Sequence, residues 1–194
     1  MTWREKLSLV PTNNSTLLRS IIGKRIVELV HYASDQPAVL LADHAFAARG
    51  VTAQQLFSQA DGPAGLVLEE GLALVFYGDE ELASIAVEVA DRAELDADWT
   101  LGIASDDPEY SEPRFARVRG RSIVAIRVLQ PVFDPHVAAA RLFERPREAG
   151  VGLGLDDGTE LIFSFALVDA PNNFAVLTAE DVSSVRAREV ARWP

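Results

Sequence analysis

The chain carries the stretch Gly-Lys-Arg-Ile-Val-Glu-Leu at residues 23–29 and returns to it as Gly-Arg-Ser-Ile-Val-Ala-Ile at residues 120–126. A second stretch, Glu-Glu-Gly-Leu-Ala-Leu-Val-Phe at residues 69–76, returns as Asp-Asp-Gly-Thr-Glu-Leu-Ile-Phe at residues 156–163. The order of the two stretches is the same in both halves. Self-similarity on this scale predicts two copies of one small β-rich unit joined in a single chain.

The two copies differ in length between their landmarks. The leading glycines, Gly23 and Gly120, are 97 residues apart, whereas the turn glycines, Gly71 and Gly158, are 87 residues apart. The first copy is therefore ten residues longer between these points. We expect the surplus in residues 43–60, where the pattern predicts short helices.

Local patterns predict an α+β fold with mainly antiparallel sheets and a few short helices. Both expected hairpins have glycine in the turn, where a positive φ is usual. The expected strands are residues 25–32, two arms of a hairpin over 65–77, and residues 82–89, 122–129, 151–155, 160–165 and 173–177. Helices are expected at 17–22 after an N-cap in 13–16, at 43–60, from Asp134 onward, and as a short turn from Thr178. The tail, residues 183–193, fits either a strand or a helix.

The length and the apolar content allow one medium domain or two small domains packed together. The chain has 194 residues, of which 48% are hydrophobic, and this suffices for a sizeable core. We expect one compact body in which residues 1–90 form the first half, residues 91–112 an acidic connector and residues 113–194 the second half.

Composition also bears on the compartment. No apolar run approaches the roughly 20 residues needed to cross a bilayer. The opening residues, Met-Thr-Trp-Arg-Glu-Lys, lack the apolar region of a secretory signal. The chain has no cysteine, which excludes disulfides and thiolate chemistry and fits a reducing compartment. We therefore expect a cytoplasmic protein without a membrane association.

The net charge of -11 is concentrated between the two copies. Residues 1–90 hold 6 basic and 11 acidic side chains, and residues 113–194 hold 11 and 10. Residues 91–112 hold eight acids (Asp91, Glu94, Asp96, Asp98, Asp106, Asp107, Glu109, Glu112) and one base, Arg92. This balance disfavours nucleic acid, whose phosphates would be repelled, and favours a basic protein partner.

The small size, the acidity and the absence of catalytic motifs are similar to those of bacterial immunity proteins, which bind and block one cognate toxin. The resemblance rests on the overall character of the chain and on residues 91–112. It implies a non-catalytic, toxin-neutralising protein without a cofactor, whose partner is a basic toxin domain. The predicted partner-binding residues are Asp96, Asp98, Trp99, Asp106, Asp107, Glu109, Tyr110 and Glu112, with the two aromatic side chains as interface anchors. The alternative is a solvated connector whose charge is answered by Arg114, Arg117, Arg119 and Arg121.

Catalytic signatures do not stand out. The sequence has no nucleophile elbow and no phosphate-binding loop, and the glycine-rich run at 150–154 fits close backbone packing in a sheet better than a ligand loop. The paired acids at 69–70 and 156–157 fall at expected hairpin tips, which are usually solvated, so we do not expect a catalytic pair there.

A metal or acid–base site has one weak candidate. Of the three histidines, His44 and His136 follow Asp43 and Asp134 in roughly corresponding parts of the two halves. The four side chains would form a site if the halves brought them together. We favour the simpler interpretation, in which each aspartate caps a short helix and the histidine lies in its first turn.

Two other functions remain open besides toxin neutralisation. The protein could be a small-ligand or metal-binding module, or an enzyme, with its site between the two halves. It could also be a structural or assembly subunit, whose interface the sequence cannot distinguish from core. The oligomeric state does not follow from the sequence.

Overall fold

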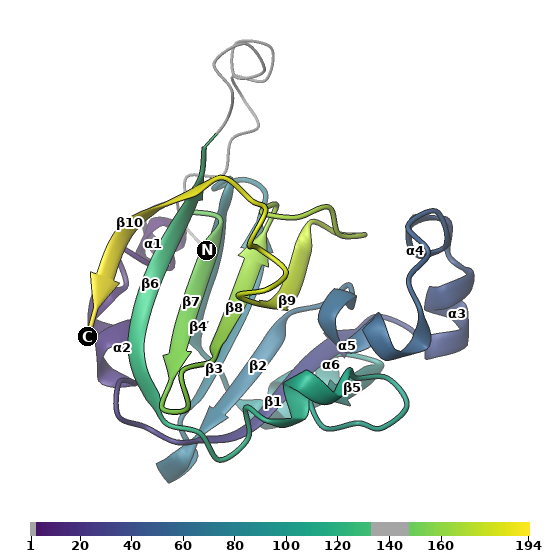
Figure 1. Ribbon diagram of the computed structural model, residues 1–194, viewed down its shortest axis with the longest axis horizontal. Coiled ribbons are helices and arrows are strands. Elements are labelled where there is room, and N and C mark those ends of the chain that lie inside the picture. The colour runs from purple at the N-terminus through teal and green to yellow at the C-terminus, as the bar shows by residue number, and fades with distance from the viewer. Residues whose placement is uncertain (1–2, 133–147) are drawn as a thin grey trace.

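The computed structural model describes residues 3–132 and 148–194. These residues form two five-stranded antiparallel sheets, with strand orders β4-β3-β2-β1-β5 and β10-β6-β7-β8-β9 (Figure 1). The strands are β1 (Ile26–Ala33), β2 (Ala64–Leu68), β3 (Ala73–Asp79), β4 (Ser84–Val89), β5 (Leu101–Ala104), β6 (Ile123–Pro131), β7 (Gly150–Leu155), β8 (Glu160–Phe165), β9 (Phe174–Thr178) and β10 (Ala187–Trp193).

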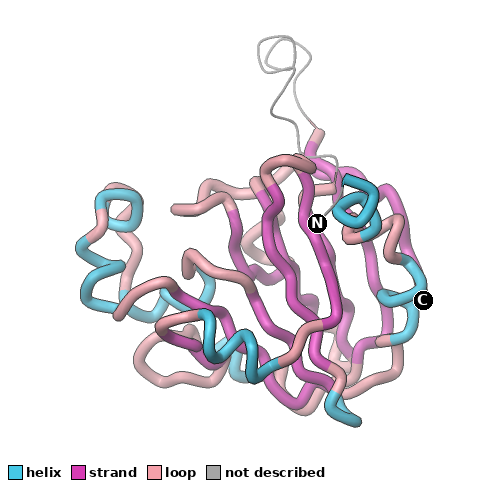
Figure 2. The backbone as a smooth tube through the Cα atoms, turned by 180° about the vertical axis from the view of Figure 1, so that it is seen from behind, coloured by secondary structure: helices cyan, strands magenta, loops and turns pink. Residues whose placement is uncertain are grey.

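Short helices flank the strands (Figure 2). They are α1 (Trp3–Ser8), α2 (Ser15–Ser20), α3 (Pro37–Ala42), α4 (His44–Ala47), α5 (Leu56–Gln59), α6 (Arg92–Asp98) and α7 (Pro113–Ala116), with 3-10 turns η1 (Ala53–Gln55) and η2 (Glu69–Gly71). The predicted α+β fold with antiparallel sheets and few short helices is confirmed. None of the described helices is both long and apolar enough to span a membrane.

The internal repeat extends to strand order and register. Each sheet places its first strand between its second and its fifth, so that β1 corresponds to β6 and β5 to β10. The pair Leu29 and Leu66 in β1 and β2 has its counterpart in Ile126 and Leu153 in β6 and β7. The register shifts at the equivalent point in both ladders, directly after Ile26 and Ile123. The halves are therefore two copies of one folding unit.

The two copies meet through reciprocal backbone hydrogen bonds. The Gly23 N–H donates to the carbonyl of Ile123 over 2.7 Å, and the Gly120 N–H donates to the carbonyl of Ile26 over 2.7 Å. Each of these four residues has its repeat counterpart on the other side, which defines a pseudo-twofold axis. Both glycines have φ above +80°, a conformation that residues with a Cβ rarely adopt.

The core lies between the two sheets, which pack face to face (Figure 1). Phe76 of β3 and its repeat counterpart Phe163 of β8 stack in parallel, with ring centroids 3.8 Å apart and an interplanar angle of 1°. Both side chains are fully buried. Strand alternation explains the packing, because Leu74 and Phe76 face the core while Val75 and Tyr77 face the opposite side of the sheet. We refer to that opposite side as the outer face.

Most predicted elements form near their expected positions, with some differences. Residues 43–60 contain α4, η1 and α5, as expected for the surplus in the first copy. The tail forms strand β10. Asn14 precedes α2, but its side chain does not cap that helix, because it donates to the carbonyl of Val87 over 2.8 Å instead. Residues 178–181 form a single turn. The helix expected from Asp134 lies outside the described residues.

The acidic segment 91–112 contains regular structure. It begins with α6, where the Asp91 side chain accepts from the N–H of Ala93 over 2.8 Å and so caps the helix. It continues with β5, which pairs with β1 at the edge of the first sheet. The N-terminal part of this segment therefore completes the first copy in the way that β10 completes the second.

Candidate functional site

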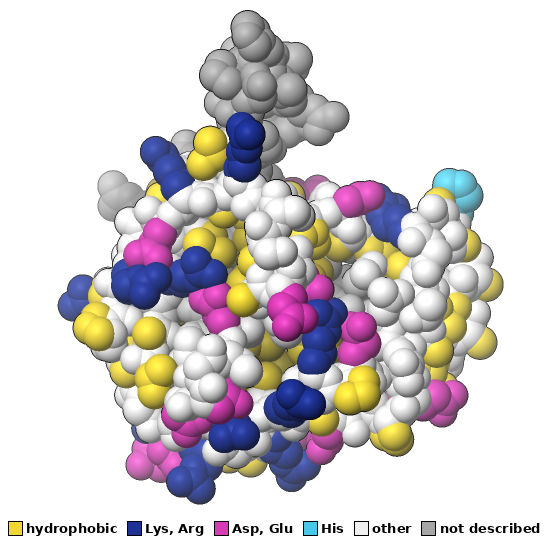
Figure 3. All heavy atoms as spheres, viewed as in Figure 1, with side chains coloured by type: hydrophobic (Ala, Val, Ile, Leu, Met, Phe, Trp, Pro, Cys, Tyr) yellow, Lys and Arg dark blue, Asp and Glu magenta, His cyan; other side chains and the backbone are white. Residues whose placement is uncertain are grey.

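Several predicted partner-binding acids already have partners within the chain. The pairs are Asp96 with Tyr32 and Arg92, Asp106 with Arg119, and Glu112 with Arg114. Burial, followed by the hydrogen bond to Asp96, raises the pKa of the Tyr32 hydroxyl well above its usual value. Part of the charge between the copies is thus answered by nearby arginines. On the face in Figure 3, acidic and basic side chains lie next to one another.

The remaining predicted residues are spread over four environments: a loop, the edge of the core, the exposed surface and a cleft. Asp107 accepts from the N–H groups of Glu109 and Tyr110 and so shapes the loop after β5. Tyr110 packs partly against the core, and Asp98 is exposed. Trp99 alone lines a cleft. The structure therefore does not bring the eight predicted residues into one patch, and their role in partner binding stays a prediction.

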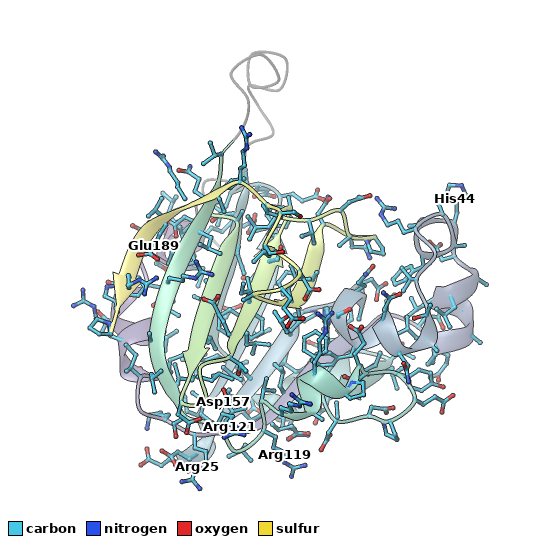
Figure 4. The ribbon with its side chains drawn as sticks, in the orientation of Figure 1. Arg25, His44, Arg119, Arg121, Asp157 and Glu189 are labelled. Atoms are coloured by element: carbon cyan, nitrogen blue, oxygen red, sulfur yellow. The ribbon has the colours of Figure 1, made fainter. Side chains whose placement is uncertain are left out.

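The structure describes only two of the four residues of the candidate metal site, Asp43 and His44. Asp43 caps α4, because its carboxylate accepts from the N–H of Ala45 over 2.7 Å. His44 is exposed, at the far end of the α3–α4 segment (Figure 4). The cap interpretation is thus confirmed for this pair. Asp134 and His136 lie outside the described residues. Within residues 3–132 and 148–194, no group of three histidine, aspartate or glutamate side chains could hold a metal ion.

The paired acids at the hairpin tips stabilise the turns. Glu70 lies 2.7 Å from Lys24, and its repeat counterpart Asp157 lies 3.1 Å from Arg121 (Figure 4). The hydrogen bond from Lys24 lowers the pKa of Glu70, and hydrogen bonds from Thr159 lower the pKa of Asp157. These carboxylates are therefore held as charged partners of nearby bases.

A cleft of about 370 Å³ lies at the outer face of the first sheet and reaches Phe165 and Phe174 of the second half. Six parts of the chain line it: the loop before β2, strand β3, the β3–β4 connection, strand β4, helix α6 with the residue after it, and the β8–β9 region of the second half. The lining residues are Asp61, Gly62, Pro63, Val75, Tyr77, Gly78, Glu80, Glu88, Leu95, Trp99, Phe165, Asn172 and Phe174. We call this feature the acidic aromatic cleft, because three members are carboxylates and four are aromatic.

Two glycines let aromatic rings form the walls of the cleft. A Cβ at Gly62 would lie 2.8 Å from the ring of Trp99 and 2.7 Å from the carbonyl oxygen of Tyr32. A Cβ at Gly78 would lie 2.2 Å from the ring of Phe165. Both distances are far below van der Waals contact. Glycine is therefore required where each ring crosses the backbone.

A buried histidine supports one edge of the cleft. The His31 side chain is fully buried, with Nδ1 2.5 Å from the carbonyl oxygen of Phe57 and Nε2 3.1 Å from that of Gly62. Its ring also packs edge-on against Phe174. Burial lowers the pKa of His31 to about 4, although both carbonyls favour the protonated ring. The side chain thus ties α5 and the loop before β2 to the second half.

The ionisable side chains that line the cleft include three carboxylates, Asp61, Glu80 and Glu88. Among residues 3–132 and 148–194, none that lines the cleft is lysine, arginine or histidine. Asp61 is oriented by Ser34, whose N–H donates over 2.8 Å and whose hydroxyl also donates. The pKa of the Tyr77 hydroxyl is raised, first by burial and then by the charge of Glu88. Asp61 is thus held in place and Glu88 lies near Tyr77, and none of the described lining residues carries a basic side chain.

The equivalent place in the second half is closed. There Ile162 and Leu177, the counterparts of Val75 and Glu88, belong to a small apolar cluster on the outer face of the second sheet. Leu167 and Ala170, from the connection between β8 and β9, are buried in the same cluster. The connection between β3 and β4, residues 80–83, belongs to neither apolar cluster, and it places Glu80 in the lining of the cleft. The cleft is therefore the uncovered version of a site that the second half fills with its own chain.

Local sequence patterns did not predict most of the residues that line the cleft. Trp99 was the one predicted residue, and Glu88 and Tyr77 look like ordinary outer-face residues of strands. The comparison of repeat counterparts could have identified them, since a tyrosine and a glutamate stand where the second copy has Ser164 and Leu177. Comparisons with protein-family models, with curated proteins and with solved structures found no match.

Proposed function

We propose that this protein is a non-catalytic binding protein that receives a basic region of a protein partner in the acidic aromatic cleft. The observation that carries the proposal is a concave site in which carboxylates and aromatic rings converge, with no basic residue among the described residues of its lining. Protein interfaces use aromatic anchors in pockets, and carboxylates in such pockets select cationic groups. The net charge of -11 adds long-range attraction for a basic partner.

We further propose that the partner is a toxin and that the protein acts in the cytoplasm as its immunity protein. The same acidic character disfavours nucleic acid as the partner. Asp98 and Glu109 are exposed acids that would extend the contact beyond the cleft in this proposal. Trp99 links the two regions, because it follows α6 and lines the cleft.

The experiment is affinity capture from the native cell with the full chain as bait. Three baits are compared: the wild type, Glu88→Lys in the cleft, and Glu69→Lys at the exposed hairpin tip, which makes the same charge change elsewhere. We expect one basic protein to be retained by the wild type and by Glu69→Lys and lost from Glu88→Lys. Circular dichroism checks that all three baits are folded.

The captured protein is then produced in a susceptible host. Growth arrest that is relieved by the wild type, and not by Glu88→Lys, would support the immunity function. A captured protein that does not arrest growth would reject that function. Equal retention by Glu88→Lys and Glu69→Lys would reject the cleft as the binding site.

A small-ligand module is the second candidate, and one observation favours it. The cleft combines residues of both halves, with Phe165 and Phe174 from the second copy facing Tyr77 and Trp99 from the first. Its volume of about 370 Å³ is within the range of ligand pockets, about 300–1,000 Å³. Retention of a small cation by the purified wild type, with no protein captured, would favour this candidate.

A further inference from the structure

We infer that the group bound in the acidic aromatic cleft is the side chain of an arginine carried by the partner. This inference rests on the proposed function and goes further, because it names the chemical group that is recognised. Three observations support it: the occupant of the equivalent place in the second half, the residue differences between the two places, and the geometry of the charged lining.

The second half shows what fits on this part of the fold. The side chain of Leu167 reaches over Gly150, the counterpart of Pro63, where an added Cβ would lie 2.6 Å from the leucine Cδ1. Leu167 is carried by a chain segment that crosses the outer face of its own sheet. By analogy with Leu167, we expect the occupant of the cleft in the first half to be a side chain that projects from a backbone segment. Because the cleft is open, another molecule would supply that side chain.

The lining residues determine the chemistry of that side chain. Leu177 of the second half is replaced by Glu88, and Ser164 is replaced by Tyr77, and both replacements line the cleft. An aliphatic side chain with a positively charged end satisfies both parts of the cleft. Its methylene groups would lie against Val75 and Leu95, as Leu167 lies against Ile162.

Arginine fits this lining better than lysine does. Guanidinium is planar and delocalised, so one of its faces can stack on Trp99 or Tyr77. Its N–H groups then donate sideways, in the plane of the guanidinium, to the carboxylates. Ser34 orients Asp61, so this carboxylate presents an oxygen without a large ordering cost, and Glu88 adds a second carboxylate to the lining. Lysine would offer one compact ammonium, which reaches fewer of these acceptors at once.

The test is an NMR titration of the full chain, with the indole N–H of Trp99 as the reporter. The probes are N-acetyl-arginine N-methylamide, the corresponding lysine and citrulline derivatives, and free arginine. We expect the blocked arginine derivative to bind with a Kd on the order of 1 mM, as a fragment of its size allows. The neutral citrulline derivative should bind at least about tenfold more weakly, because it loses the charge-assisted hydrogen bonds.

Matched variants assign the contact. Glu88→Gln should weaken binding of the blocked arginine by about tenfold, and Tyr77→Phe should weaken it less, since the ring remains. Glu69→Gln at the hairpin tip should leave the affinity unchanged. Equal affinity for the citrulline and arginine derivatives, or no effect of Glu88→Gln in a folded protein, would overturn the inference. Tighter binding of free arginine than of its blocked derivative would reject the claim that the bound arginine is part of a polypeptide chain.

The outcomes separate this inference from the proposed function. If a basic protein is lost from the Glu88→Lys bait but the arginine derivative causes no shift, the function stands and the arginine assignment is rejected. If the derivative binds but no basic protein is captured, the cleft chemistry stands and the toxin-neutralising function is rejected.

Discussion

Acidification should destabilise this protein through His31. The pKa of this side chain falls from 6.5 to about 4 on folding, because the ring is fully buried. Between these values the unfolded chain binds the proton and the native protein does not, so stability decreases as the pH falls through this window. Relative to neutral pH, the loss from this one group is about 1 kcal/mol at pH 5.5 and about 2 kcal/mol at pH 4.5.

Two measurements test this reasoning. Urea unfolding at several pH values gives the free energy of unfolding for the wild type and for His31→Gln, which cannot become charged but keeps an N–H donor. We expect the difference between the two proteins to change by about 2 kcal/mol between pH 7 and pH 4.5. NMR of the imidazole protons follows the ring of His31 directly. Parallel pH profiles, or a His31 ring that titrates near pH 6.5, would refute the argument.

The remaining predictions concern packing and polar satisfaction. Phe163→Ala should lower the free energy of unfolding by about 3–5 kcal/mol while unfolding stays a single transition, which urea melts will show; separate transitions for the two halves would contradict a shared core. Gly78→Ala should lower the free energy of unfolding by about 1–3 kcal/mol, because the new Cβ would lie 2.2 Å from Phe165. Gly154→Ala, whose Cβ would meet nothing nearer than 3.5 Å, should lower it by at most about 1 kcal/mol. Equal melting temperatures for the two variants would contradict the close approach at Gly78. Ser164→Ala should be neutral or stabilising by up to about 1 kcal/mol, since this hydroxyl is buried without a hydrogen-bond partner among the described residues, and a clear loss on calorimetry would reveal a missed partner.

The fold was largely predictable because its signals are local and are repeated. Each hairpin joins two apolar runs around a turn glycine, and Gly71 and Gly158 do have the positive φ that such turns require. The tail was ambiguous because Ala187–Trp193 is an exposed edge strand, with Arg188 and Arg192 on its surface, so burial leaves no alternation to detect. The reciprocal contact of Gly23 and Gly120 depends on how the halves dock, which no local pattern encodes.

The candidate site was predictable only in part, for a physical reason. The high density of acidic residues in 91–112 predicted a partner-binding surface there. An acid in such a run, however, often pairs with the nearest base in its own chain. Asp106 and Glu112 are paired in this way with Arg119 and Arg114. The cleft acids, by contrast, are scattered along the chain. Only the folded sheet brings Asp61 and Glu88 to the same hollow, where none of the described lining residues is basic.

The pseudo-twofold junction has a consequence for stoichiometry. A dimer of identical subunits must present every surface feature twice, so it cannot keep one copy of a hollow open and the other filled. A tandem fusion of the two units removes that restriction, because each copy then mutates independently. The junction at Gly23 and Gly120 keeps the geometry of such a dimer, while Leu167 occupies one of the two equivalent positions. The described residues thus leave one of the two equivalent positions open, and if the cleft binds a partner as proposed, complexes should form with one partner per chain.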